Sequence, residues 1–261
     1  MSLPSYEFVT AQAEGRLLVV TINRPDSLNS LHPPANKEMS DVFDRFAADP
    51  DLWVAIVTGA GERAFSAGND LRWTAQNNGV VDIPPAGFGG LTNRFDLFKP
   101  IIAAVNGFAL GGGFEIALAC DIIIASEKAK FGLPEPKVGL AALAGGMHRL
   151  PRQIGLKNAM ALMLTGRHVD AAEAYRLGIA QEVVAPDKLM QRAREWAAEI
   201  LECAPLSVRA SKQVAMGSLG HPLEEAVKIK FPAVRDLSRS EDFREGPRAF
   251  AEKRKPNWKG C

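Results

Sequence analysis

Two acidic residues are the first candidates for chemistry in this chain of 261 residues. Glu115 lies inside the apolar run NGFALGGGFEIALACDIII (106–124), directly after three glycines. Burial is costly for a charged carboxyl unless a partner offsets it, so an acid at this position calls for a functional explanation. Glu135 stands between Pro134 and Pro136, which stiffen the backbone and fix the direction of the side chain. Alone it is typical of a surface glutamate, but two positioned carboxyls can divide general acid and general base work.

The three glycines at 111–113 predict a helix that begins with uncovered backbone N–H groups. Such a helix end carries partial positive charge and suits an oxygen that becomes negative only during a reaction, which is an oxyanion hole. A tight strand-to-helix turn explains the glycines equally well. A second loop, ERAFSAGNDL (62–71), follows a buried strand and turns through Gly68. Its N–H groups could point into the same cavity.

Other kinds of site fit the sequence poorly. Ile116 stands where a dinucleotide-binding motif needs its third glycine, and no P-loop is present. Ser66 lacks the preceding glycine of the hydrolase nucleophile motif. No cluster of His, Asp and Glu has metal-ligand spacing, so we expect no metal. The histidines are scattered and have no evident partner in the sequence: His32, His148, His168 and His221.

Alternating strand and helix patterns must position these residues. Short apolar runs predict strands in the segments 16–25, 53–71, 101–107 and 121–132. The segment 33–50 predicts a helix, because its apolar residues are spaced for one face. Continuous apolar strands with intervening helices favour an α/β core of crossover units. The segment 74–93 is rich in Gly, Pro and Asn and predicts a mobile loop.

The C-terminal part of the chain is predicted to be helical. Strand patterns nearly stop after about residue 145, and helical patterns occupy 186–201, 206–216, 222–237 and 240–253. The tail 244–260 is mainly basic, which is typical of a solvated charged face, although local anion binding is a sharper alternative.

The composition is that of an ordinary globular chain, 47% hydrophobic and 23% charged, with a net charge of +1. The near-zero charge gives no support for nucleic acid or an anionic membrane as partner. No apolar segment reaches the roughly 18 residues of a membrane span, and the N-terminus has no signal pattern. Cys120, Cys203 and Cys261 form neither a disulfide framework nor a zinc pattern. We therefore expect a cytoplasmic protein.

Several segments, taken together, resemble the crotonase (enoyl-CoA hydratase/isomerase) family. The matching motifs are NRPDSLNSL (23–31), AFSAGNDL (64–71), AAVNGFALGGGFEIALACD (103–121) and FGLPEPKVGL (131–140). The resemblance extends through GGMHRLPRQIG (145–155) and SEDFREGPRAFAEKRKPNWKG (240–260) over nearly the whole chain. Within the family, GGFEIALA and GPRAFAEKRKPNWKG are most similar to carnitinyl-CoA dehydratases.

The resemblance implies a crotonase-like α/β spiral of ββα units, with residues 1–200 as the catalytic core. Residues 201–261 would form a C-terminal helical region that builds trimers, often stacked into hexamers. Asn69 and Gly112 are implied to donate the two N–H groups of an oxyanion hole for a thioester enolate. Glu115 and Glu135 match the two catalytic glutamates of hydratases, with Glu135 acting on the proton at Cα and Glu115 on the attacking water.

The implied substrate is an acyl-CoA thioester of the kind found in fatty acid metabolism. Neither a metal nor a redox cofactor is implied, because coenzyme A is part of the substrate. Coenzyme A is expected to run past Arg24, Leu28, Ala67, Asp70 and Leu71. Phe250 and Lys253 match a position that reaches the nucleotide end, in some relatives from a neighbouring subunit.

Departures from the family pattern leave the acyl chain open. The common I-P-G-A-G-G reads LAALAGG here, and Met147, His148 and Asn69 also differ from the usual residues. The first prediction is reversible syn hydration of an enoyl-CoA to the 3-hydroxyacyl-CoA. A carnitinyl-CoA dehydratase acting on crotonobetainyl-CoA comes second and an enoyl-CoA isomerase third. The alternative from another class is a CoA-ester- or RNA-binding protein of the same fold without activity.

Overall fold

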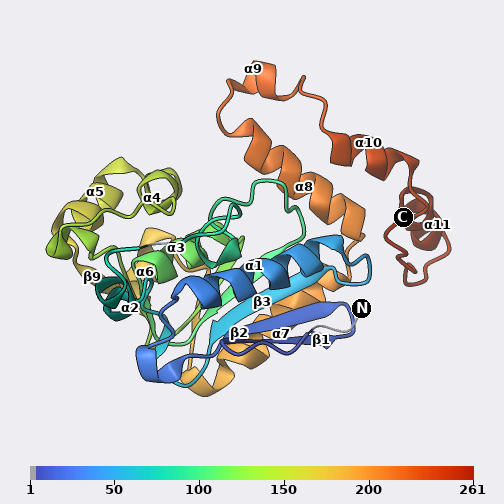
Figure 1. Cartoon of the computed structure of the whole chain (residues 1–261). Coiled ribbons are helices and arrows are strands. Elements are labelled where there is room, and N and C mark those ends of the chain that lie inside the picture. The colour runs from blue at the N-terminus through green and yellow to red at the C-terminus, as the bar shows by residue number, and fades with distance from the viewer. Residues whose placement is uncertain (1–3, 81) are drawn as a thin grey trace.

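A six-stranded sheet forms the larger layer of the protein, for which a computed structural model describes residues 4–80 and 82–261 (Figure 1). Its strands lie in the order β1 (Val9–Glu14), β2 (Leu17–Ile22), β3 (Val54–Gly59), β5 (Ile101–Val105), β7 (Ile122–Ser126) and β10 (Glu182–Val184). β1 and β2 pair in antiparallel fashion, whereas all later neighbours pair in parallel. The apolar runs predicted as strands therefore form the buried centre of this sheet.

A second sheet of four strands leads the chain to the candidate residues. Its strands are β4 (Ala64–Ser66), β6 (Phe108–Leu110), β8 (Lys130–Gly132) and β9 (His168–Asp170). β4, β6 and β8 are parallel, so their carboxyl ends meet at one edge of the sheet. Gly68 follows β4, helix α3 (Gly112–Ala119) follows β6, and Glu135 follows β8. The topology alone thus brings the two candidate loops and the second acid to the same edge.

Helices cover both faces of the large sheet. Successive side chains of a strand point to opposite faces, so Leu18 of β2 enters one hydrophobic core and Val19 enters the other. Helix α1 (Pro33–Ala48) lies over the first face, and its buried residues confirm the predicted helical face. Helix α7 (Leu189–Leu201) packs on the second face through buried residues that recur at helical spacing: Leu189, Ala193 and Ala197.

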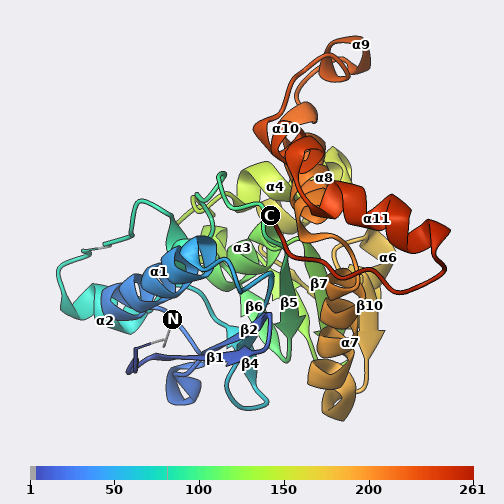
Figure 2. The same cartoon turned by 90° about the vertical axis from the view of Figure 1, so that its right-hand side faces the viewer.

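The C-terminal helices extend away from this core (Figures 1 and 2). They are α8 (Pro205–Ser218), α9 (Leu223–Ala226), α10 (Pro232–Arg239) and α11 (Asp242–Ala251). Lys212 of α8 pairs with Asp121 at 2.7 Å and ties the extension to the core. The prediction of one helical segment over 222–237 is wrong, because Pro232 forces Phe231 into an extended conformation (φ −93°, ψ 135°) and starts a new helix.

Residues 145–184 hold more regular structure than the sequence patterns predicted. They contain α4 (Gly146–Ile154), α5 (Leu156–Thr165), α6 (Ala171–Leu177) and the short strands β9 and β10. Three-residue strands are too short to show an alternating pattern. The predicted loop 74–93 overlaps two helical elements: residues 74–76 belong to α2 (Leu71–Gln76), and residues 88–90 form the 3₁₀ helix η2 (Phe88–Gly90), which packs on α1. Position 81 of this loop lies outside the described residues. Among the described residues, no helix combines the length and apolar character needed to cross a membrane.

Candidate active site

The N-terminus of α3 is the centre of the candidate site. Gly112 is the first helical residue and Gly111 precedes it with φ 53°, so the predicted helix start at the three glycines is confirmed. Gly68, with φ +86°, approaches so closely that a Cβ atom there would lie 2.7 Å from the Gly112 nitrogen. Any side chain at Gly68 would therefore cover the Gly112 N–H group, which glycine leaves open.

Two backbone N–H groups beside this contact, those of Asn69 and Gly112, have no acceptor among the described residues. The N–H of Leu31 donates to the Gly68 carbonyl at 2.8 Å, and the N–H of Asp70 donates to the Leu31 carbonyl at 3.1 Å. Because successive N–H groups of an extended chain alternate in direction, that of Asn69 faces away from Leu31. Within residues 4–80 and 82–261, neither the Asn69 nor the Gly112 N–H donates a hydrogen bond. The two predicted oxyanion donors are thus free to bind a ligand oxygen.

Glu115 lies one turn into α3, and only 3% of its surface is exposed. Its Oε1 accepts a hydrogen bond of 2.8 Å from the N–H of Gly146, the first residue of α4. The pKa of the Glu115 carboxyl is raised to about 7, chiefly by burial and in smaller part by the Glu135 carboxyl. The N–H groups of Gly146 and Ala144 and the Arg149 guanidinium oppose that rise. Near neutral pH this carboxyl is therefore suited to both gaining and losing a proton.

Glu135 reaches the same helix end from η3 (Glu135–Val138), the 3₁₀ helix that follows β8. Its Oε1 lies 2.9 Å from the position of a Cβ atom on Gly111, whose carbonyl accepts the N–H of Glu115. Its Oε2 is buried and has no hydrogen-bond partner among the described residues. Burial raises the pKa of this carboxyl above its ordinary value. The structure thus brings both predicted catalytic glutamates to one helix end.

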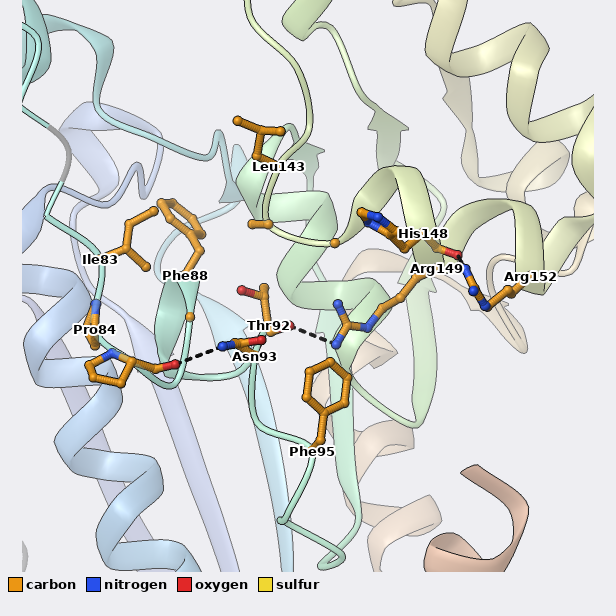
Figure 3. A pocket seen from close by; sticks show the side chains of 14 residues that line it. Ile83, Pro84, Phe88, Thr92, Asn93, Phe95, Leu143, His148, Arg149 and Arg152 are labelled. Carbon is orange, nitrogen blue, oxygen red and sulfur yellow. Dashed lines mark hydrogen bonds between the residues drawn. The ribbon is translucent and has the colours of Figure 1, made fainter. Parts of the chain in front are cut away.

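A cavity of about 850 Å³ opens beside α3 (Figure 3). The Phe88 ring lines the cavity and also packs against the N-terminus of α3, because a Cβ atom on Gly112 would lie 2.6 Å from that ring. Ala144 and Gly145 line the cavity next to Gly146, which holds Glu115. The other lining residues combine apolar and basic side chains, among them Ile83, Phe95, Leu143, His148, Arg149 and Arg152. Neither glutamate is among the residues that line the cavity.

The other polar residues at this edge support the loops. Ser66 is fully buried, donates to the Asn29 carbonyl at 2.8 Å and accepts the N–H of Gly68 at 3.1 Å, so its hydroxyl is not available as a nucleophile. The Asn69 side chain donates to the Thr74 hydroxyl at 3.0 Å and is held against α2. In the described part of the chain, no group of three His, Cys, Asp or Glu residues is placed to hold a metal ion.

Five predicted coenzyme A contacts lie together where the segments 24–31 and 67–71 meet. Arg24 forms a salt bridge of 2.9 Å with Asp70, and a second guanidinium nitrogen donates to the Ser30 carbonyl. The N–H of Ala67 donates to the Leu28 carbonyl at 2.9 Å. These bonds bring together Arg24, Leu28, Ala67, Asp70 and its neighbour Leu71.

Phe250 and Lys253 do not join these five residues within one chain. They lie in and just after α11, on the far side of the molecule from α2 (Figures 1 and 2). Phe250 is 88% exposed, so the described residues of its own chain leave it largely uncovered.

Comparison with known proteins identifies the family. Residues 12–261 match the family model described as enoyl-CoA hydratase/isomerase. The chain belongs to this family. It is 45% identical over 251 residues to carnitinyl-CoA dehydratases of Citrobacter koseri and Proteus mirabilis, covering 94% of this chain and 96% of each relative.

Solved structures of the enoyl-CoA hydratase/isomerase family have the same fold. The crystal structure of enoyl-CoA hydratase from Mycobacterium tuberculosis H37Rv matches with a TM-score of 0.90 and 38% identity, covering 97% of this chain and 99% of that chain. A probable enoyl-CoA hydratase/isomerase from Mycobacterium abscessus matches with a TM-score of 0.90 and 40% identity, covering 98% and 100%. The predicted family and crotonase-like fold are confirmed.

Two side chains of this family member were not predicted as part of its site. Phe88 lies in the segment predicted as a mobile loop, and Arg149 lies in a stretch that contributed only to the resemblance. The sequence carried a signal for each: glycines surround Phe88, and Arg149 follows the pair Gly145–Gly146 by about one helical turn. Glycines beside a lone large side chain indicate close packing against backbone.

Proposed function

We propose that this protein adds water reversibly across the α,β double bond of an enoyl-CoA thioester, giving the 3-hydroxyacyl-CoA. The observation that carries the proposal is a pair of carboxyls, buried Glu115 and half-buried Glu135, at one helix end beside two N–H groups that have no acceptor among the described residues. Moving a proton between two carbons can be done by one acid. Water addition instead uses a base for the water and an acid for the carbon, which accounts for both glutamates.

In the proposed reaction, the N–H groups of Asn69 and Gly112 bind the thioester oxygen and stabilise the enolate as the water oxygen bonds to Cβ. Ionised Glu115 takes a proton from this water, and protonated Glu135 delivers a proton to Cα. Glu115 gains one proton and Glu135 loses one, so exchange with solvent restores the pair. Both groups lie at the same end of α3, which favours addition to one face of the double bond. The reverse sequence removes water.

The coenzyme A portion is proposed to lie along the five grouped residues at the junction of 24–31 and 67–71. The reaction consists of the addition of water to Cβ and two proton transfers, aided by backbone donors, and the proposal includes no metal or redox cofactor. The cytoplasm is the proposed compartment, because the thiols of Cys120, Cys203 and Cys261 are free and a reducing environment keeps thiols in that state.

Dehydration of carnitinyl-CoA to crotonobetainyl-CoA is the second candidate. It is supported by the 45% identity to proteins of that name over 94% of the chain. The two candidates share the same glutamates and differ only in the acyl tail, which in the second carries a quaternary ammonium group. An isomerase or a protein that only binds CoA esters would leave at least one of these two carboxyls without a role.

We propose further that the protein forms a trimer or a dimer of trimers through residues 201–261. Exposed apolar side chains in two parts of the chain support this proposal. One part is the C-terminal extension, with Leu219, Leu223 and Val227 around α9 and Phe243 and Phe250 on α11, all more than half exposed. The other follows α5 at helical spacing and comprises Leu156, Met160 and Leu164.

When one surface of each copy contacts a different surface of the next copy, the copies form a closed ring if the successive rotations return to the first copy. In such a ring Phe250 and Lys253 of one copy could reach the coenzyme A site of the next. Sedimentation is expected to show a trimer or hexamer at micromolar concentration. A stable monomer of 28.2 kDa would contradict the proposed assembly.

A substrate panel tests the proposed reaction. The purified protein is mixed with crotonyl-CoA, longer 2-enoyl-CoA esters, crotonobetainyl-CoA and a 3-enoyl-CoA, and products are identified by mass spectrometry. Hydration predicts a product heavier by one water molecule and loss of the enoyl absorbance. Turnover of the 3-enoyl ester alone, without change of mass, would indicate an isomerase. Binding of the esters without any turnover would contradict all enzymatic alternatives.

A further inference from the structure

Arg149 presents a positive charge to the cavity without an acidic partner of its own. It lies in the first turn of α4 and is half-buried. One guanidinium nitrogen donates to the Thr92 carbonyl at 2.9 Å, and the guanidinium carbon lies 5.6 Å from the centre of the Phe95 ring (Figure 3). Among the described residues, no carboxylate forms a salt bridge with it, although arginines in proteins are commonly paired in this way. Its charge is therefore left to act on more distant acids.

The same guanidinium packs against the turn that holds Glu115. A Cβ atom on Gly145 would overlap a nitrogen of Arg149, so the two residues are in direct contact. The backbone N–H of Arg149 also donates to the Gly145 carbonyl at 2.8 Å. The next residue, Gly146, donates its N–H to Glu115 at 2.8 Å. A continuous series of contacts thus runs from Thr92 through Arg149 and this turn to the buried carboxyl.

Few ionisable groups surround Glu115. The elements packed on α3 are β4, β6, η2 and α4; the first three carry no ionisable side chain, and α4 supplies His148, Arg149 and Arg152. Glu135 faces Glu115 from η3 and raises the pKa of that carboxyl, whereas Arg149 lowers it. The buried thiol of Cys120 is the remaining titratable group beside Arg149. Arg149 is thus the cation whose charge opposes the rise that burial and the second carboxyl cause, beside the larger effect of the Gly146 N–H group.

We propose that Arg149 is a positioning residue for Glu115: fixed by Thr92, it holds the turn at 144–146 against the carboxyl and favours its ionised form. This inference rests on the proposed hydration, in which Glu115 must be ionised to accept a proton from water. A buried carboxyl beside another carboxyl would otherwise stay protonated over much of the neutral range. Arg149 makes no contact with the reacting atoms in this account and acts only through Glu115.

The test compares three variants. Arg149→Gln removes the charge, and Arg149→Lys keeps the charge but cannot reproduce the contacts of the planar guanidinium. Arg152→Gln is the matched control, because Arg152 lies on the same helix, is exposed and donates to the His148 carbonyl at 2.7 Å. For each protein, the pH dependence of kcat and kcat/KM is measured for hydration of crotonyl-CoA or whichever ester the parent turns over.

Arg149→Gln is expected to move the acidic limb of the profile upward by about one pH unit, which lowers the rate well below the limb by about tenfold. Arg149→Lys is expected to leave the limb near the parental pH while the plateau of kcat falls. Arg152→Gln is expected to leave the limb in place. Infrared absorption of the protonated Glu115 carboxyl, assigned by its loss in Glu115→Gln, is expected to titrate with the same shift in the absence of substrate.

An unshifted infrared titration in folded Arg149→Gln, or equal shifts in the glutamine and lysine variants, would overturn the inference. If Arg149→Gln does not fold, a shifted titration in Arg149→Lys would overturn it instead. Absence of turnover in the parent with an intact infrared response would contradict the proposed reaction and leave the coupling of Arg149 to Glu115 supported. The two failures are therefore distinguishable.

Discussion

Replacing Glu115 by glutamine is expected to stabilise the folded chain at alkaline pH while it removes the proposed base. The pKa of this carboxyl is raised from an ordinary 4.5 to about 7 by burial. Between these values the folded chain keeps a proton that the unfolded chain has released, so the free energy of unfolding falls as the pH rises through this window. The shift of about 2.5 units, at about 1.36 kcal/mol per unit, gives a loss of about 3 kcal/mol. Glutamine does not ionise, so the variant avoids that loss.

Urea unfolding at constant protein concentration, followed at about pH 4 and about pH 8, measures the effect. At each pH, the free energy of unfolding of the variant is compared with that of the parent. The change in this difference between the two pH values is the relevant quantity, because any packing effect of the amide is the same at both. Glu115→Gln is expected to gain about 3 kcal/mol relative to the parent between the acidic and the alkaline condition. Glu127→Gln, a substitution at an exposed glutamate, serves as control and is expected to gain nothing comparable. A stability difference that does not change with pH would refute the reasoning.

Three further predictions concern the oxyanion hole, coenzyme A and the assembly. Gly68→Ala places a methyl group 2.7 Å from the Gly112 nitrogen, and a folded variant, checked by circular dichroism, is expected to lose roughly a hundredfold in kcat; unchanged turnover would exclude Gly112 as a donor. Arg24→Ala is expected to weaken coenzyme A binding in titration calorimetry and raise KM without moving the acidic limb of the pH profile. Lys253→Ala and Glu115→Gln chains, each impaired alone, are expected to regain activity when mixed subunits assemble, and failure of complementation would place Lys253 outside the neighbour's site.

The parts of the fold that could be predicted are those that local patterns encode. The apolar runs of β2, β3 and β5 and the periodic face of α1 each show their period within a few residues. The helix start at Gly112 could be predicted because consecutive glycines have no side chains to cover the backbone N–H groups. Glu115 and Glu135 were found because an acid in an apolar run, or between two prolines, departs from what its neighbours require.

The parts that could not be predicted depend on contacts between distant segments. Gly68 leaves the Gly112 N–H group open because it closely approaches the start of α3. Gly112 lies more than forty positions later in the chain, so no local pattern shows this contact. Phe88 was assigned to a loop because the glycines and prolines around it indicate turns, yet η2 packs on α1. The position of Arg149 depends on the Thr92 carbonyl. Every residue has a backbone carbonyl, so the sequence does not show which one accepts this hydrogen bond. Phe250 and Lys253 were assigned to coenzyme A only through the resemblance, and within one chain they lie apart from the other predicted contacts.

The most direct test of the two-carboxylate account is the hydration rate of Glu115→Gln and Glu135→Gln beside the parent. Glutamine keeps the shape of each side chain but cannot exchange a proton at neutral pH, and a general acid or base contributes about 10²–10⁴-fold. Loss of enoyl absorbance from crotonyl-CoA and crotonobetainyl-CoA is followed for all three proteins, with ester binding measured separately. Both variants are expected to bind the ester and to hydrate it at least about a hundredfold more slowly than the parent. Hydration at the parental rate by either folded variant would contradict the account.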